Sequence, residues 1–407
     1  MFFLGMDLSL DWFDFYVLNQ SGTKLFSGRL NCSHDGYTSL FEKIRNKHIP
    51  FEKIHVALEN PHHPLVLACM MKNMNVYAVN PKTTDRLRDR HRPGRTKSDA
   101  FDAYVLADFL RTDLHRLSPL LPSSEDDRRL LSLHRDLEAL KRSRGKIIHQ
   151  LSQALDESFP TVKKLFSDPY CPSAIAFIKN WPSLESAKKH FPRRATHFFK
   201  KYSFSHSRRK TFLSTLKEAT PVTYDQAIEQ TRESFLKALA EQISLINDQI
   251  ASFEKQIQNV IEHHPDRDIF KSLPGVGKTI LTGLLVVFCS KENHFQNARS
   301  LKAQAGLSPV VFSSGKFLRA NRFRHACQKN WRNIFTLWAF VCISPKRCLW
   351  ARLHYDQLRN EGKSHYHALR ILASKLAKIT FACWRDRTFY DEKQFLASKM
   401  EHLLLTT

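Results

Sequence analysis

Acidic residues are scarce in this sequence. The 407-residue chain contains 39 Asp and Glu against 63 Lys and Arg, which gives a formal net charge of +24. Solubility alone would explain a positive charge, but here the excess is clustered, and clustered cations are typical of proteins that bind nucleic acid. The sequence shows no lipid-facing amphipathic helix that would favour an acidic membrane surface instead. We therefore expect a nucleic-acid-binding protein.

Long apolar runs are also missing. No stretch reaches 18 apolar residues, so we expect no membrane-spanning helix. The apolar beginning, MFFLGMDLSLDWFDFYVL, has no basic leading segment and is interrupted by aspartates, so we expect no signal peptide. The eight cysteines form no C-x-x-C pair and lack the paired-histidine spacing of zinc sites. They are predicted to be reduced, mostly buried thiols of a cytoplasmic protein, without structural zinc.

The chain is long enough for two to three domains, and residues 1–118 have the pattern of an α/β domain. Three strand-like runs come first, and strands then alternate with helices. Three antiparallel strands followed by this alternation favour a mixed sheet over a purely parallel one. The predicted strands are 2–9, 12–19, 23–31, 53–60 and 75–81, and the predicted helices are 36–47, 62–73 and 97–112.

Residues 119–264 contain two long helices of coiled-coil character. Both carry apolar residues at alternating three- and four-residue spacings, the period of a supercoiled seam, and Arg144 interrupts the first one. Two arrangements fit this pattern: antiparallel packing within one chain, or pairing between chains. The seam residues are Leu130, Leu133, Leu137, Leu140, Ile147, Leu151 and Ala154 in the first helix, and Leu236, Leu239, Ile243, Ile246, Ile250, Phe253, Ile257 and Val260 in the second.

A basic, aromatic insert, residues 161–222, separates these two helices. It has 13 Lys and Arg against 3 Asp and Glu, together with 10 aromatic residues. Basic residues follow phosphates and aromatic side chains can stack on unpaired bases, so one interpretation is a nucleic-acid-binding module. The other is a small helical subdomain with a charged outer face.

Residues 265–407 are predicted to be mostly helical, and they begin with a glycine-containing turn, LPGVGKT. A phosphate-binding P-loop would need glycine at position 272, which is serine, so an NTPase is excluded. The same residues fit a helix–hairpin–helix, in which Gly275 and Gly277 allow a tight turn and the helix start at Lys278 holds a DNA phosphate. A plain turn between helices is the alternative.

The few acidic residues include a set of four whose placement is informative. Asp7 lies on the first predicted strand, Glu59 ends a buried strand, and Asp99 and Asp102 share one face at the start of a helix. Helix capping alone explains either member of that pair, but the four together could hold two divalent ions for phosphoryl transfer. Asp11 and Asp14 are weaker candidates, because strand alternation places them on a solvated face.

Two cationic segments accompany these carboxylates. RLRDRHRPGRTK, residues 86–97, precedes Asp99 and is predicted to be a loop that opens onto the metal site. SPVVFSSGKFLRANRFRH, residues 308–325, holds Ser313 and Ser314 at a turn. The cations predicted to contact nucleic acid are Arg92, Arg95 and Lys97 in the first segment, and Lys316, Arg319, Arg322 and Arg324 in the second.

These motifs together resemble a known family. Asp7 in GMDLS, Glu59 in VALEN and the aspartate pair in RTKSDAFDAYVLADF resemble the DEDD motif of bacterial insertion-sequence transposases related to Piv-type DNA invertases. LPGVGKTILTGLL and AQAGLSPVVFSSGKFLRANR are similar to that family's second conserved domain. The order and spacing of the motifs cover both ends of the chain and the coiled coil between them.

The resemblance implies a RuvC-like domain of RNase H type at 1–118, which binds Mg²⁺ through the four carboxylates. It implies a transposase domain at 265–407 whose serine forms a transient phosphoserine link with DNA. Ser314 is that serine, because the family has serine directly before Gly-Lys or a similar pair; Ser313 stands where the family often has aspartate. It further implies donor and target DNA, a noncoding bridge RNA, a dimer that assembles to a tetramer, and a cytoplasmic location at the nucleoid.

The mechanism that follows is strand exchange without ATP. Ser314 would attack a DNA phosphodiester at the carboxylate–Mg²⁺ site, and its neighbouring cations would neutralise the attacked phosphate. Two other classes stay open. One is a RuvC-like nuclease that cuts with metal-activated water, in which Ser314 is only a turn residue. The other is a non-catalytic scaffold that binds nucleic acid.

Overall fold

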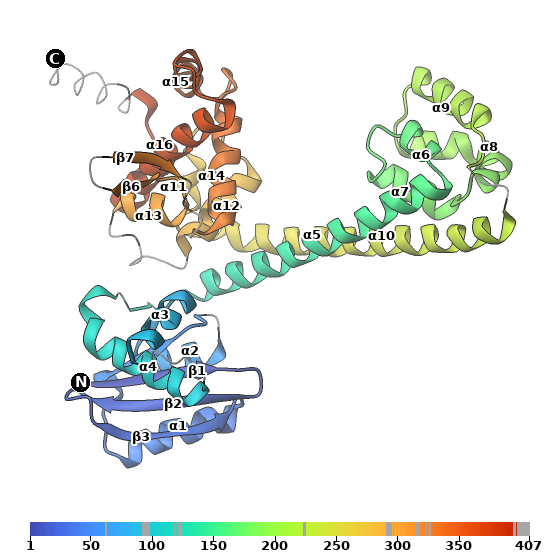
Figure 1. Ribbon diagram of the computed structural model, residues 1–407. Coiled ribbons are helices and arrows are strands. Elements are labelled where there is room, and N and C mark those ends of the chain that lie inside the picture. The colour runs from blue at the N-terminus through green and yellow to red at the C-terminus, as the bar shows by residue number, and fades with distance from the viewer. Residues whose placement is uncertain are drawn as a thin grey trace. The chain divides into compact units, whose positions relative to one another are not determined.

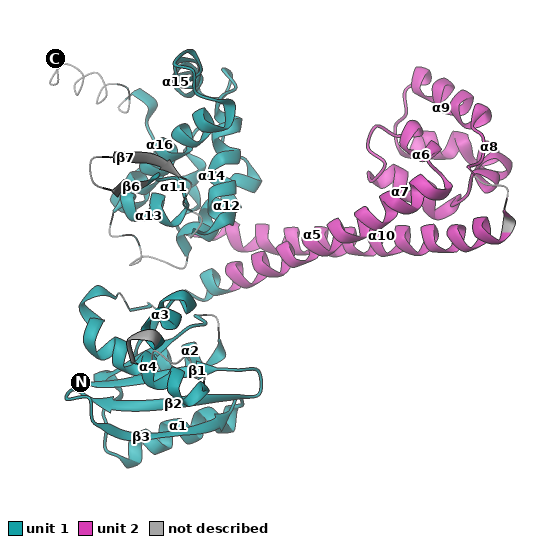
Figure 2. Ribbon diagram, viewed as in Figure 1, with its two compact units in different colours: residues 1–128, 265–407 teal, residues 129–264 magenta. Residues whose placement is uncertain are grey.

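The computed structural model (Figure 1) describes most of the chain in two compact units. One unit contains residues 1–128 and 265–407, and the other contains residues 129–264 (Figure 2). The described residues are 1–61, 63–91, 98–117, 119–120, 124–222, 225–289, 295, 297–314, 317–322, 324, 327–393 and 396.

A five-stranded mixed sheet forms the N-terminal part, as predicted. Its strand order is β3-β2-β1-β4-β5. The first three strands are antiparallel neighbours, whereas β4 runs parallel to β1 and β5 runs parallel to β4. The strands are β1 (Phe2–Leu8), β2 (Trp12–Asn19), β3 (Lys24–Asn31), β4 (Ile54–Leu58) and β5 (Asn75–Ala78), all within one or two residues of the sequence-based expectation except at the end of β5.

Helices cover both faces of this sheet (Figure 1). On one face α1 and α2 close a core that includes Leu4, Met6 and Val56. On the other face α4 packs on a second core that includes Phe3 and Leu106. The helices of this part are α1 (His34–Asn46), α2 (Pro64–Met71), α3 (Pro81–His91) and α4 (Asp99–Asp113), with short 3-10 turns η1 (Phe51–Lys53) and η2 (Leu114–Arg116).

Gly5 brings α4 into direct contact with β1. A Cβ atom at this position would lie 1.9 Å from the backbone oxygen of Ala103 and 2.5 Å from the backbone nitrogen of Ala107. No side chain can be accommodated there without moving the helix, so a glycine facing two alanines sets the helix–sheet distance. At its N-terminus the helix is capped by Ser98, whose side chain accepts a hydrogen bond from the Phe101 amide.

In the unit of residues 129–264, α5 (Glu125–Ser158) and α10 (Gln226–Glu262) lie side by side within the chain (Figure 1). Their polar contacts show that they are antiparallel, because the residue number falls along α10 as it rises along α5. The three contacts are Lys141 Nζ to Glu254 Oε1 at 3.2 Å, Arg144 Nη1 to Asn247 Oδ1 at 3.1 Å, and Arg232 Nη2 to Glu157 Oε2 at 2.6 Å. Arg144, which interrupts the apolar seam, is thus matched by a polar residue on the facing helix.

The insert between these helices is a small helical subdomain with an aromatic core. Eight of its ten aromatic side chains are buried there, and the remaining two, Tyr170 and Tyr202, pack against the core. The prediction that these aromatics stack on bases is therefore wrong, because burial in the core excludes bases from their faces. The helices are α6 (Thr161–Leu165), α7 (Pro172–Asn180), α8 (Leu184–Lys201) and α9 (His206–Glu218), and the buried aromatics are Phe166, Phe177, Trp181, Phe191, Phe198, Phe199, Phe204 and Phe212.

The C-terminal part is mostly helical, as expected, and also contains a β-hairpin that the sequence reading placed as a turn. A buried carboxylate, Asp266, ties its two ends together, accepting a hydrogen bond from Trp384 Nε1 at 3.0 Å and pairing with Arg387. The elements are α11 (Arg267–Lys271), α12 (Lys278–Cys289), α13 (Ala298–Gln304), β6 (Val310–Ser314), β7 (Phe317–Arg322), α14 (Lys329–Cys342), α15 (Leu349–Asn360) and α16 (His365–Asp386).

The cysteines and the helix lengths bear on two earlier expectations. All eight cysteines are free thiols, and five of them are buried. Burial raises the pKa of Cys69 to about 12, so this thiol stays protonated at neutral pH. Among the described helices, none combines the length and the apolar content needed to cross a bilayer.

Candidate active site

The predicted carboxylates of the sheet lie on neighbouring strands at the same edge. Met6 of β1 is paired with Leu58 of β4 in the parallel register, so Asp7 and Glu59 follow as the next pair of positions. Gly5 and Asp7 are two residues apart on β1 and belong to one face. That is the face on which α4 packs.

The first turn of α4 brings the other two predicted carboxylates to this face. Asp102 precedes Ala103, the residue that contacts Gly5, and its side chain is only 2% exposed. Asp99 lies one turn earlier and is 43% exposed. The sheet and the helix N-terminus therefore present all four predicted carboxylates on one side of the sheet.

Arg88 of α3 neutralises the buried member of this set. Its guanidinium donates from Nε to one oxygen of Asp102 and from Nη2 to the other, the second at 2.7 Å. Hydrogen bonding to Asp102 is the main cause that raises the pKa of Arg88, and the negative charge of Glu59 raises it further.

Arg29 of β3 likewise neutralises two carboxylates, those of Asp14 and Asp99. Its Nη2 atom lies 2.7 Å from Asp14 Oδ2 and 3.2 Å from Asp99 Oδ2. Asp14 is 5% exposed and is directly opposite Asp7 in the β1–β2 register. The prediction that Asp14 lies on a solvated face is wrong, because helices cover both faces of the sheet. Asp11, in contrast, is exposed.

Five carboxylates and two arginines thus share this site. Asp7, Glu59, Asp99, Asp102 and Asp14 all belong to the described part of the chain, and no three of them have oxygens within 4.8 Å of one another. The set is chemically suited to a hard divalent cation, which prefers carboxylate oxygens. The arginines supply the compensating charge in this arrangement, so a cation would have to take the place of Arg88 at Asp102.

The cationic segment before α4 is helical over its first half, which corrects the prediction of a loop over residues 86–97. The α3 helix extends to His91. It begins at Pro81 because Asn80 caps its start, accepting a hydrogen bond from the Lys82 amide at 2.9 Å, and proline favours the first helical position. The three predicted phosphate contacts of this segment, Arg92, Arg95 and Lys97, lie outside the described residues.

The glycine-containing turn of the C-terminal part joins α11 to α12. Gly275 has φ +71°, a left-handed conformation that favours glycine, and nothing lies within 4 Å of a Cβ atom built at Gly277. Lys278 is the first residue of α12 and is exposed. The open backbone at Gly277 and the adjacent helix start leave room for a phosphate.

The two candidate serines occupy the last two positions of β6. Ser314 is paired with Phe317, the first residue of β7, and Ser313 is paired with Leu318. Of the four cations predicted beside them, Arg319 and Arg322 are on β7, Arg324 follows it and is half-buried, and Lys316 lies outside the described residues.

Sequence reasoning missed two residues of the site, Arg29 and Arg88, and ranked a third, Asp14, as a weaker candidate. Arg29 sits opposite Asp14 in the β2–β3 register, so a charge pair across two predicted strands was the available signal. Arg88 was visible only as one arginine in a basic segment. No spacing in the sequence distinguishes it from its neighbours.

Two family matches cover both ends of the chain. Residues 4–160 match a family described as "Transposase", with a DEDD transposase domain of the IS110 kind. Residues 267–356 match the "Transposase IS116/IS110/IS902 family". The first match spans all four predicted carboxylates, and the second spans both candidate serines.

Similar proteins extend these matches over nearly the whole chain. The "Mini-circle putative transposase for IS117" of Streptomyces coelicolor is 26% identical over 407 residues, covering 98% of this chain and 97% of the relative. An uncharacterised 43.6 kDa protein of insertion element IS110, from the same organism, is 26% identical and covers 96% of both chains. A 44.8 kDa protein of insertion element IS116 from Streptomyces clavuligerus is 23% identical and covers 92% of both.

A mixed sheet that gathers carboxylates under a helix start, matched by transposase families at both ends, defines this chain as a DNA transposase. More closely, it belongs to the IS110/IS116 family of insertion-sequence transposases.

Proposed function

We propose that this transposase cuts and rejoins the DNA of its insertion sequence through a Mg²⁺-dependent RuvC-like site and a covalent phosphoserine at Ser314. The observation that carries the proposal is the convergence of Asp7, Glu59 and the Asp99–Asp102 pair on one side of the sheet. The strand order, three antiparallel strands continued by two parallel ones, supports the RNase H-type assignment.

The carboxylates would hold the metal. Asp102 is the ligand with the least exposure to solvent, and its charge requires a partner in every state of the protein. Asp7, Glu59 and Asp99 would complete the oxygen set, and Asp14 lies beside Asp7 as an additional carboxylate. When bound, Mg²⁺ would supply positive charge for the phosphate oxygens and for the leaving oxygen.

The serine would exchange one ester bond for another. The Ser314 hydroxyl oxygen forms a bond to the DNA phosphorus, the bond from phosphorus to one DNA oxygen breaks, and that oxygen leaves as a free hydroxyl after it gains a proton. In the second step a DNA hydroxyl attacks the phosphoserine and releases Ser314. Both steps conserve the number of phosphoester bonds, so no ATP is required.

The cations of the hairpin and of the segment before α4 would position the DNA. Arg319, Arg322 and Arg324, with Lys316, would neutralise the attacked phosphate, and Arg92, Arg95 and Lys97 would follow the adjacent backbone. The turn at Gly275 and Gly277, followed by Lys278, would act as a helix–hairpin–helix that holds a further phosphate.

The assembly is proposed from the family resemblance. The carboxylate domain (1–118) and the serine domain (265–407) would act together across the subunits of a tetramer built from dimers. The coiled-coil helices of region 119–264 would connect them. Donor and target DNA would be selected by a noncoding bridge RNA, in the cytoplasm at the nucleoid.

A strand-exchange assay with 5′-labelled insertion-sequence ends tests the chemistry. Ser314→Ala should abolish both DNA exchange and the protein–DNA adduct seen in denaturing gels, while the matched variant Ser313→Ala keeps them. If Ser314→Ala still cuts DNA, the chain is a nuclease that uses water. If Glu59→Ala and Asp99→Ala leave exchange intact, the carboxylates have no catalytic part.

A further inference from the structure

The insert presents its cations to solvent. Eight aromatics fill the core, and 11 of the 13 cations are exposed on the outer face of the insert. We call this outer face the insert surface. Its exposed cations are Lys164, Lys179, Lys188, Lys189, Arg193, Arg194, Lys200, Lys201, Arg208, Lys210 and Lys217, and Lys163 and Arg209 are half-buried.

Carboxylates do not neutralise the insert surface. Within residues 161–222, all of which are described, Lys163 is the one cation in an ion pair, with Asp156 of α5 at 2.6 Å. Several of the others use backbone or ring contacts instead; Arg209, for example, donates to the Phe204 carbonyl at 2.8 Å. These contacts leave the positive charge uncompensated, so the surface attracts polyanions.

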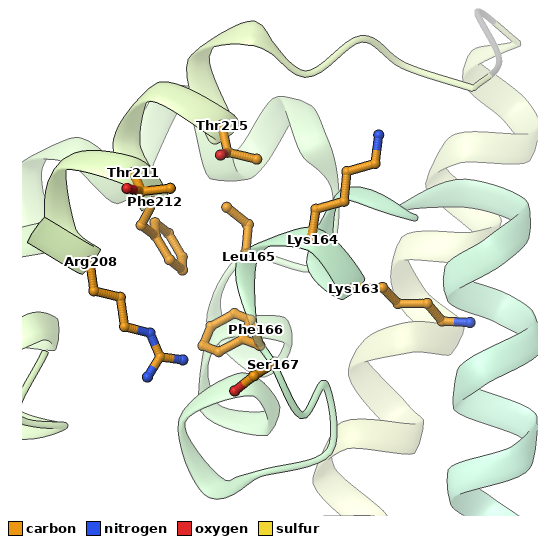
Figure 3. A pocket seen from close by; sticks show the side chains of 9 residues that line it. All are labelled: Lys163, Lys164, Leu165, Phe166, Ser167, Arg208, Thr211, Phe212 and Thr215. Atoms are coloured by element: carbon orange, nitrogen blue, oxygen red, sulfur yellow. The ribbon is translucent and has the colours of Figure 1, made fainter.

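A pocket between α6 and α9 shows where a polyanion would fit (Figure 3). Its volume is about 330 Å³. Lys164 of α6 and Arg208 of α9 stand on its two sides, and the hydroxyls of Ser167, Thr211 and Thr215 line it. Phe166 and Phe212, members of the aromatic core, also line the pocket.

The lining of the pocket suits phosphate. Cations and hydroxyls are the groups that contact phosphate and sugar oxygens in protein–DNA complexes. No carboxylate side chain lines the pocket, so no negative charge of the lining repels a phosphate. Arg208 lies over the Phe204 ring, 4.5 Å from its centroid, so its position is fixed before a ligand arrives.

We propose that the insert is a second DNA-binding site, in which Lys164 and Arg208 hold the phosphodiester backbone of a DNA duplex in the α6–α9 pocket. The site is separate from strand exchange and does not require that chemistry. Because it contacts backbone alone, its binding is independent of base sequence and strongly dependent on salt.

The test measures duplex binding by the full-length protein in EDTA, where strand cleavage is prevented. Fluorescence anisotropy with two unrelated 30-base-pair DNA duplexes gives the association constant over a range of salt concentrations. In Lys164→Gln/Arg208→Gln the slope of log K against log salt should fall by about 2 on both duplexes. The matched control, Lys237→Gln/Lys255→Gln, removes two exposed cations of α10 and should leave the slope unchanged.

Three outcomes would overturn the proposal. An equal decrease of the salt slope in the pocket variant and in the control would show that DNA is attracted by the charge of the whole protein and not by the pocket. A decrease of the salt slope on only one of the two DNA duplexes would contradict recognition of the backbone. A duplex RNA of the same sequence is measured in parallel, and a decrease of the slope confined to this RNA would assign the pocket to RNA.

A loss of DNA binding can be distinguished from misfolding and from a failure of the Ser314 chemistry. If Arg208→Gln disturbs the subdomain, Lys164→Gln alone should lower the slope by about 1, because Lys164 is exposed. The phosphoserine adduct is not part of the measurement, so failure of the Ser314 chemistry leaves the binding result unaffected, and a failed binding result leaves that chemistry intact.

Discussion

Asp102 is the central residue of the candidate site. It is almost fully buried, and Arg88 binds both of its oxygens. Removing one partner of a buried ion pair costs about 3–5 kcal/mol, because the remaining charge is uncompensated. If Asp102 is also a metal ligand, a divalent cation can replace the missing charge.

We therefore expect Arg88→Met to lower the melting temperature in EDTA by at least about 5 °C. Added Mg²⁺ should then raise the melting temperature more in the variant than in the wild-type protein, because the cation no longer competes with a guanidinium. Differential scanning fluorimetry over a Mg²⁺ titration measures both effects. Arg86→Met, an exposed neighbour, should change neither. A Mg²⁺ response that is equal in all three proteins would contradict the metal assignment.

Individual site residues were only partly predictable. Asp7, Glu59, Asp99 and Asp102 could be selected because acidic residues are rare and their positions relative to predicted elements were informative. Asp14 was misjudged, since strand alternation assigns a face but does not tell whether a helix covers it. Arg88 could not be singled out, because the Asp102 contact depends on how α3 and α4 pack.

At the scale of elements, the contact between α4 and β1 sets the site. Gly5→Ala would place a Cβ atom against backbone of α4, where no side chain can yield. We expect the variant to lose about 1–3 kcal/mol of unfolding free energy, as overpacked cores do. Urea denaturation measures this loss.

Gly145→Ala is the matched control for that substitution. It lies in the exposed middle of α5 with nothing within 4 Å, and it should gain about 0.5–1 kcal/mol from helix propensity. A Gly5→Ala variant as stable as the wild-type protein would contradict the direct contact between α4 and β1.

The aromatic cluster is the element-scale feature of the insert. Phe177 is fully buried and contacts several rings, including Phe166 and Phe191. Phe177→Ala should destabilise residues 129–264 by about 3–5 kcal/mol, whereas Phe235→Ala, 42% exposed on α10, should cost well under 1 kcal/mol. Hydrogen exchange followed by mass spectrometry resolves the effect on the insert helices. If the insert helices are equally protected from hydrogen exchange in both variants, the aromatic side chains do not form a core.

Elements were more predictable than their packing. Alternating and helical periodicities located the five strands, α1, α2 and α4 to within about three residues, whereas α3 was not predicted. The composition of the insert was equally consistent with exposed and buried rings, because a sequence lists aromatics without their partners. The β6–β7 hairpin was taken for a turn, since Ser-Ser-Gly in a basic segment gives little strand signal.

At the scale of the whole molecule, transposase matches at both ends place the carboxylates and the serine in separate parts of one chain. The proposed chemistry therefore requires that two segments far apart in the sequence act on one phosphodiester. The insert adds DNA binding that does not depend on either segment. Similar proteins of nearly equal length align with this chain from one end to the other.

The most direct measurement of the central claim is the location of the covalent link. The protein is incubated with insertion-sequence-end DNA and Mg²⁺, denatured, and digested with nuclease and protease, and the nucleotide-bearing peptide is sequenced by mass spectrometry. If Ser314 is the nucleophile, the nucleotide is found on Ser314 and disappears in Asp102→Asn and in EDTA. Cut DNA without any modified peptide, or a nucleotide attached to another residue, would contradict this assignment.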